Sequence, residues 1–139
     1  MADGPLASEF GVTVSAGTLR AEAPGWTIPH PWTDAGVAVQ GGGNGATMLH
    51  AAIALCVLND TFREAGALGV EVRGVRVHAD GGFDTEVWVS GGITYRVEVD
   101  SPASSAELVA LHARVDDVAE IPRVLRAGAS VDRVPEAAR

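Results

Sequence analysis

A stretch of apolar residues, 46–58, constrains the fold more than any other part of the chain. Asn44 before it is a favoured helix cap, and Gly66 and Gly69 after it are suited to end a helix. We therefore predict a helix from Asn44 to about Ala67. The first three turns are apolar on every side, and such a helix has to be buried on every side.

The only cysteine of the chain, Cys56, lies inside this predicted helix. A thiol on a buried helix is either a small, unreactive apolar side chain or a nucleophile that the fold has enclosed. The sequence pattern alone leaves both interpretations open, and the function of the chain depends on which one holds.

The segment before the helix carries strand patterns. Apolar residues alternate in 10–14 and again in 19–23, on either side of Gly17, which predicts a β-hairpin. Residues 24–43 contain three prolines, two tryptophans and several glycines. We expect this part to be an irregular loop with at most one short strand, and loops of this length often bind ligands.

The segment after the helix predicts a β-meander and two further helices. Strands are expected at 70–79, with a bulge at Gly74, at 86–89 and at 93–99. Ser104 and Glu107 form a capping-box pattern before a helix that ends near Val118. Pro122 suits the first turn of a short helix, 122–127, and a last strand is expected near Val131. The fold class is therefore α+β, in one domain over residues 1–139 with loose tails at 1–8 and 133–139.

Composition excludes several functions. The net charge of −8 argues against a nucleic-acid partner, because phosphates need a basic face. All ten basic residues are arginine, so no lysine is available for a Schiff base. The apolar run is shorter than a bilayer span, and no secretory signal is visible, so we expect a soluble cytoplasmic protein. No spacing typical of metal ligands occurs, and no cofactor is implied.

The order of elements and several motifs resemble the OsmC/Ohr family of thiol-dependent hydroperoxide reductases. The resemblance rests on the glycine-rich run leading through the helix to Cys56, on Arg63-Glu-Ala, on the Ser-capped helix, and on the stretch from Val118 to Leu125. It implies an OsmC-like fold, with the central helices of an intertwined homodimer packed together beneath wrapped sheets. It also implies a site for a small-molecule substrate at the subunit interface.

The resemblance implies that Cys56 is the peroxidatic cysteine, which attacks the peroxide O–O bond and becomes a sulfenic acid. Family members resolve this acid with a second cysteine in a Cys-Pro pair, whereas this chain has Ile121-Pro122 there. In the organic-hydroperoxide branch a glutamate stands ten residues before the cysteine, where this chain has Ala46. Arg20, the sole arginine before the helix, is the candidate for the activating cation. Alternatively, Arg20 is a strand residue whose side chain is solvated.

Other polar residues are candidates for binding. Asp60 and Arg63 lie within about 40° of Cys56 around the helix, and Asn59 flanks the same face. This group could line a pocket at the sulfur, although Asp60 and Arg63 are also spaced as an ordinary ion pair.

Two histidines and one tryptophan complete the candidate site. His50 lies about 120° from Cys56 around the helix, so it cannot act as its general base from the same helix, and in a dimer it could meet the partner chain. His30 is held between two prolines next to Trp32, and both are expected to reach a shared cavity with Cys56.

Two functions follow as hypotheses. The first is a stress-response peroxidase in which Cys56 reduces organic hydroperoxides and is regenerated by an external thiol. The alternative is a peroxidase-inactive protein of the same fold that binds or converts a small apolar molecule at the dimer interface.

Overall fold

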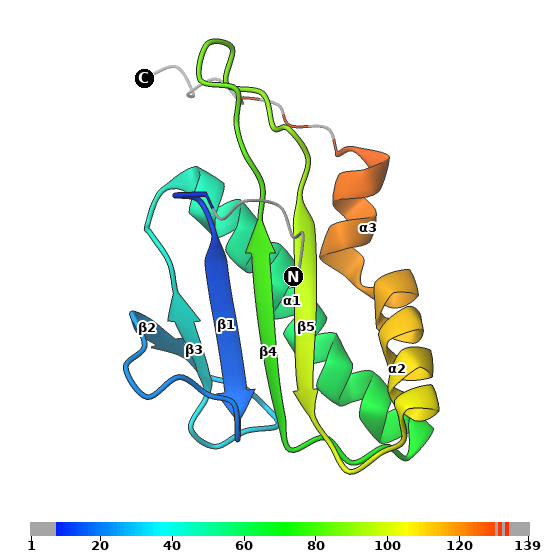
Figure 1. Cartoon of the computed structure of the whole chain (residues 1–139). Coiled ribbons are helices and arrows are strands. Elements are labelled where there is room, and N and C mark those ends of the chain that lie inside the picture. Colours follow the sequence, from blue (N-terminus) through cyan, green and yellow to red (C-terminus); the bar gives the residue numbers. More distant parts are fainter. Residues whose placement is uncertain (1–7, 130, 132, 134–139) are drawn as a thin grey trace, which may run out of the picture.

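The computed structural model describes residues 8–129, 131 and 133. Its five strands form one antiparallel sheet in the order β2-β3-β1-β4-β5 (Figure 1). The strands are β1 (Val12–Gly17), β2 (Trp26–Ile28), β3 (Val37–Gln40), β4 (Gly74–Asp80) and β5 (Thr94–Asp100). The helices are α1 (Gly45–Leu68), α2 (Ser105–Val118) and α3 (Glu120–Ala127). The architecture confirms the predicted α+β class.

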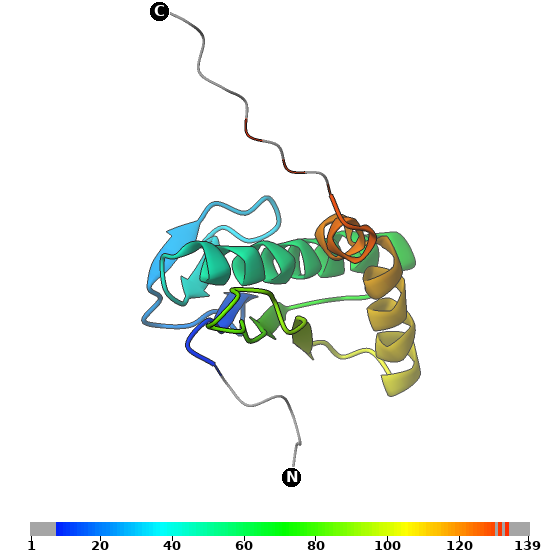
Figure 2. The ribbon, with the colours of Figure 1, turned by 90° about the horizontal axis from the view of Figure 1, so that it is seen from above.

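Helix α1 lies along one face of the sheet, and α2 and α3 lie beside the β5 edge (Figure 2). The strand side chains that point toward α1 are apolar and buried, such as Val14 and Val77, and they pack with Ala54 and Leu58 of α1. Residues on the other face are mostly polar. There Thr13 and His78, directly opposite each other on β1 and β4, are joined by a hydrogen bond of 2.8 Å.

The ends of α1 follow the predicted capping signals. The side chain of Asn44 accepts a hydrogen bond from the Thr47 N–H at 2.9 Å, and this satisfies one of the free donors of the first turn. At the other end, Gly69 adopts a left-handed conformation with φ of 70°. Gly69, and not Gly66, therefore caps the helix, whose last residue is Leu68, one residue beyond the expected Ala67.

Helix α1 is not enclosed on every side within one chain, contrary to the simplest expectation from its composition. Ala51, Ala54 and Leu58 face the sheet and are fully buried, whereas Met48 is 41% exposed. By length and composition alone, α1 could also cross a membrane. That is weak evidence, because half of its most apolar window is already buried inside the fold, as in the core helix of a soluble protein.

The predicted hairpin across Gly17 is wrong. Strand β1 pairs with β3 on one side and β4 on the other, so neither of its edges is free for residues 19–23, which form no strand. Gly17 has φ of 67°, and a Cβ there would lie 2.2 Å from the Arg73 carbonyl oxygen. The positive φ thus serves a close approach to the chain before β4 instead of a tight hairpin turn.

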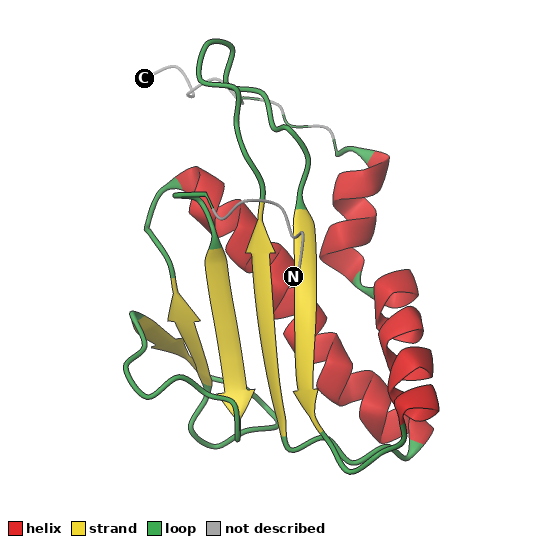
Figure 3. Cartoon of the chain, in the orientation of Figure 1, coloured by secondary structure: helices red, strands yellow, loops and turns green. Residues whose placement is uncertain are grey.

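Other predicted boundaries also change. The expected loop 24–43 contains two short strands, β2 and β3, where at most one was expected. Strand β4 begins only at Gly74, so residues 70–73 are not in the sheet and no bulge is needed there. Residues 86–89 are not a strand but belong to the long connection between β4 and β5, which rises beyond the sheet (Figure 3).

In the C-terminal part, the structure differs less from the predicted boundaries. Helix α2 begins after Ser104, whose side chain accepts from the Glu107 N–H, as predicted. Helix α3 begins at Glu120, two residues before the expected start, and Gly128 follows its end. Val131 lies in no strand. The expected loose tails lie almost wholly outside the described residues, which include only residue 8 of the first tail and residue 133 of the second.

The packing of α1 on the sheet predicts where the stability of the chain resides. Leu58→Ala, at a fully buried position, should lower the free energy of unfolding by about 2–5 kcal/mol, because it removes apolar contacts and leaves a cavity. Val109→Ala, at a position of α2 that is 67% exposed, should change it by less than about 0.5 kcal/mol. Urea unfolding at one fixed protein concentration measures both. Equal losses would contradict this description of the core.

Candidate functional site

Cys56 lies on the less buried side of α1, where the first turn of α3 packs against it. The N–H of Ile121 donates to Cys56 Sγ at 3.5 Å. Glu120 Oε2 lies 3.3 Å from the same sulfur, so the thiol donates to this carboxylate. The sulfur therefore contacts two consecutive residues of α3, although about 65 residues of chain separate them from it.

A second carboxylate approaches the sulfur from α1 itself. Asp60, one turn after Cys56, places Oδ2 3.8 Å from Sγ, and its side chain is almost fully buried. The amide of Asn59 donates to the other Asp60 oxygen at 3.3 Å. Asp60 is thus held in place beside the thiol at a position where a charge is costly.

Arg63 joins the two carboxylates. Its guanidinium lies 3.1 Å from Asp60 and 3.1 Å from Glu120, and it also contacts Glu64 at 3.4 Å. Glu64 in turn is bound by Arg114 of α2 at 2.7 Å. The expected ion pair between Asp60 and Arg63 is therefore present. The Asp60 carboxylate also lies beside the sulfur. The pair can thus be an ion pair and a part of the surroundings of the thiol at the same time.

These surroundings keep Cys56 protonated. Burial raises the pKa of the Cys56 thiol to about 11, and the nearby carboxylates of Glu120 and Asp60 add to the rise, while the Ile121 N–H opposes it. The pKa of Glu120 is lowered to about 2, first by its own backbone N–H and next by the thiol. Burial raises the pKa of Asp60. At neutral pH the resting site is a thiol that donates to an ionised Glu120.

The structure brings Cys56, Asn59, Asp60 and Arg63 together, but it places the Pro-rich loop elsewhere on α1. The His30 ring contacts the Phe62 ring with centroids 5.3 Å apart, and Trp32 lies 5.6 Å from His30. His30 Nδ1 shares a hydrogen bond with Thr33, and burial lowers the pKa of His30. Among the described residues, no hydrogen bond or ring contact joins this loop to Cys56.

His50 and Arg20 also have other surroundings. His50 is fully buried, and its Nδ1 donates to the Phe10 carbonyl oxygen at 2.8 Å. Arg20 follows β1 and donates to the Thr27 hydroxyl at 3.0 Å and to the Ala21 carbonyl oxygen. The contacts described for Arg20 therefore hold the loop beside β2, and Arg63 is the arginine of the cysteine cluster.

Glu120 and the Ile121 N–H are the site groups that sequence reasoning missed. The resemblance placed the resolving cysteine of the family at Ile121, and a residue at that position has to lie near Cys56. The neighbouring Glu120 was therefore a detectable candidate. Glu120 supplies a carboxylate to the thiol from α3. The family's glutamate on the central helix is replaced by Ala46 in this chain, so α1 supplies no carboxylate from that position.

The donor atoms of Cys56, Asp60 and Glu120 lie within 4.8 Å of one another, as a metal site would require. Arg63 already binds both carboxylates, however, and supplies the positive charge of the cluster. We therefore describe these residues as a thiol and ion-pair cluster and assign no metal to it.

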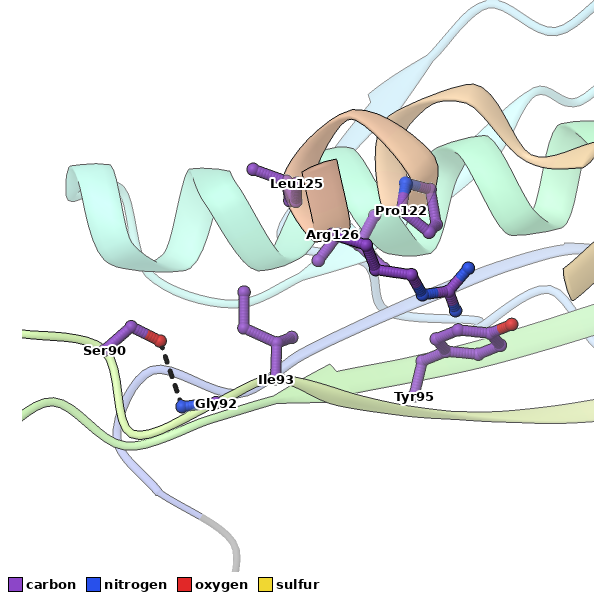
Figure 4. Close-up of a pocket in the computed structure, with 8 residues that line it drawn as sticks. Ser90, Gly92, Ile93, Tyr95, Pro122, Leu125 and Arg126 are labelled. Carbon is purple, nitrogen blue, oxygen red and sulfur yellow. Dashed lines mark hydrogen bonds between the residues drawn. The ribbon is translucent and has the colours of Figure 1, made fainter. Parts of the chain in front are cut away.

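A cavity of about 270 Å³ lies between α1, α3 and the segment leading into β5. Figure 4 shows Ile93 and Leu125 at its apolar part, with Arg126 extending toward the Tyr95 ring. Arg126 binds Asp116 at 2.8 Å, and the Tyr95 hydroxyl donates to the same carboxylate. The lining includes Ile53, three residues before Cys56 on α1, and Pro122, which follows Ile121 on α3.

Comparison with known sequence families identifies the relationship of the chain. The OsmC-like protein family matches residues 39–133, which is more than half of the sequence. The chain belongs to the OsmC-like family. The comparison with curated protein sequences gives no match.

Two solved structures are similar to the chain. The OsmC-like protein from Mycoplasma pneumoniae has 19% sequence identity and a TM-score of 0.57, over 61% of this chain and 63% of that one. This match thus spans less than two thirds of that relative. An OsmC-like hydroperoxide resistance protein from Jannaschia sp. CCS1 has 15% identity and a TM-score of 0.52, over 91% of this chain and 93% of that one. At these identities the likeness shows a shared OsmC-like fold.

The raised pKa predicts slow alkylation of Cys56 at neutral pH. A thiol with a pKa of about 11 is almost entirely protonated at pH 7, and only the thiolate reacts. The rate with iodoacetamide should therefore rise about tenfold per pH unit between pH 7 and 10, as the thiolate fraction does. Free cysteine, whose rate levels off near pH 8.5, is the reference. A rate for Cys56 that levels off below pH 8 would contradict the described surroundings of the sulfur.

Proposed function

We propose that this OsmC-like protein is a one-cysteine, thiol-dependent hydroperoxide reductase of the cytoplasm. The observation that carries the proposal is the position of Cys56, half-buried at the junction of α1 and α3, with the Ile121 N–H directed at its sulfur. A backbone N–H at the start of a helix is suited to stabilise a thiolate. The family, and the hydroperoxide resistance protein of the same fold, support a role with hydroperoxides.

The proposed reaction begins when Cys56 loses its proton to solvent. The thiolate attacks the terminal oxygen of an organic hydroperoxide, so that an S–O bond forms and the O–O bond breaks. The alkoxide takes up a proton and leaves as the alcohol, and Cys56 is left as a sulfenic acid. The sulfur is thereby oxidised by two electrons and the peroxide is reduced.

Regeneration needs an external thiol, because the chain has one cysteine. That thiol attacks the sulfenic sulfur, water leaves, and a mixed disulfide forms. A second thiol then releases reduced Cys56 and carries away the disulfide. The cavity lined by Ile53 and Pro122 supports an organic substrate, since its apolar part offers room for a small hydrocarbon group. Ile53 is three residues from Cys56 on α1, and Pro122 follows Ile121, whose N–H donates to the sulfur.

We also propose that the active form is a homodimer. Helix α1 leaves a stripe incompletely covered within one chain, which includes Met48, Leu49, Ala52 and Leu55. The connection between β4 and β5 exposes a further apolar group, Val87, Trp88 and Val89. Exposed apolar groups of this kind are typical of protein interfaces, and a second copy with its own α1 stripe would cover them.

Treatment with one equivalent of cumene hydroperoxide should add one oxygen atom to Cys56, and excess peroxide should add a second. Dithiothreitol should reverse the first step only. Peptide mass spectrometry separates this product from oxidised methionine, and Cys56→Ser is the control. If Cys56 stays unmodified at a pH and dose that oxidise free cysteine, the chemistry fails, and binding of a small apolar molecule becomes the favoured function.

Association can be tested with a charge at the α1 stripe. Met48→Glu should raise the dimer dissociation constant at least about tenfold, because the interface would have to bury a carboxylate without a partner. Val109→Glu, on the exposed side of α2, serves as the matched control and should leave association unchanged. Sedimentation equilibrium measures both. A wild-type protein that is a folded monomer at micromolar concentration would contradict the proposal.

A further inference from the structure

Glu120 has two properties that distinguish it from the other carboxylate at the sulfur. It lies closer, at 3.3 Å from Sγ compared with 3.8 Å for Asp60. Its side chain is also 58% exposed, whereas that of Asp60 is almost fully buried. Glu120 is thus held at the thiol by hydrogen bonding and by Arg63, and not by surrounding packing.

The charges around the sulfur oppose deprotonation of Cys56. Asp60 and Arg63 of α1 and Glu120 of α3 face it directly, so two carboxylates are present for one guanidinium. That guanidinium is also shared with Glu64, and the arginine of α2 that faces this group, Arg114, binds Glu64. A thiolate would place a negative charge beside the ionised Glu120 and the carboxyl group of Asp60.

We propose that Glu120 is a positioning residue that holds Cys56 as a neutral, hydrogen-donating thiol, so that loss of the Glu120 charge makes the cysteine more reactive. The proposal rests on the proposed function in taking Cys56 as the nucleophile. In this proposal the Glu120 carboxylate opposes the deprotonation of Cys56, whereas an interpretation from family motifs would count a carboxylate at this place among the groups that activate the cysteine.

The alternative role of general base is disfavoured by the acidity of Glu120. An effective base has a pKa near the working pH, whereas the pKa of Glu120 is about 2 and that of its donor is about 11. The exposed carboxylate can instead leave the thiol without unfolding the core. The Ile121 N–H would then remain as a donor to the sulfur.

The test is the variant Glu120→Gln, which keeps the size of the side chain and removes its charge. The pH dependence of alkylation by iodoacetamide should show the apparent pKa of Cys56 lowered by about one unit. The rate at pH 7 should rise roughly threefold, since about ten times more thiolate is partly offset by its lower nucleophilicity. Asp117→Asn, which removes one charge from the end of α2 with no described contact to Cys56, is the control and should match the wild type.

An apparent pKa that is unchanged or raised in Glu120→Gln would overturn the proposal. Glu120→Ala removes the hydrogen-bond acceptor as well as the charge, whereas Glu120→Gln keeps an acceptor. The apparent pKa of Cys56 should be lowered in Glu120→Ala too. An unchanged value in Glu120→Ala would likewise overturn the proposal. Thermal denaturation confirms that each variant is folded.

Consumption of cumene hydroperoxide with dithiothreitol is measured in parallel. A lowered pKa without consumption by any variant leaves the restraint intact and refutes the proposed function. Consumption of the hydroperoxide by the wild type, with the apparent pKa of Cys56 unchanged in both Glu120 variants, supports the proposed function and refutes the restraint.

Discussion

The contact between α1 and one face of the sheet is the constraint on which the rest of the structure depends. Val14 and Val77 on the two central strands meet Ala54 and Leu58 of the helix, and all four are fully buried. This contact fixes the rotation of α1, and therefore which of its residues face away from the sheet. Cys56 is among these, at the position where α3 packs. The fold thus decides both the exposure of the sulfur and the identity of its neighbours.

Features of the fold that depend on neighbouring residues were predictable from the sequence, and those that depend on distant pairing were not. The caps Asn44 and Ser104 act within three residues, and both helices that they begin were predicted correctly. The hairpin across Gly17 failed because residues 37–40 and 74–80 occupy both edges of β1. Alternation of apolar residues predicts a strand, but it does not say which strand will be its neighbour.

The same distinction applies to the site. Asn59, Asp60 and Arg63 could be placed near Cys56 because helix geometry fixes their angles around one axis. Glu120 reaches the sulfur only through the packing of α3 on α1, which no periodicity in the sequence encodes. The resemblance to the family came close, since it aligned Ile121 with a residue that has to meet the cysteine. Within one chain, the loop of His30 and Trp32 contacts α1 at Phe62. Its convergence with Cys56 on a cavity at the dimer interface stays a prediction.

Helix α3 has eight residues, and Ala119 at its start provides no side-chain cap. A helix this short is stable only through its packing, and its first turn is the part most easily unwound. That turn carries both the carboxylate and the backbone N–H that contact Cys56. Local unfolding of α3 and the acidity of the thiol are therefore thermodynamically linked. A substitution or ligand that alters the packing of α3 would change the chemistry of the cysteine without touching it.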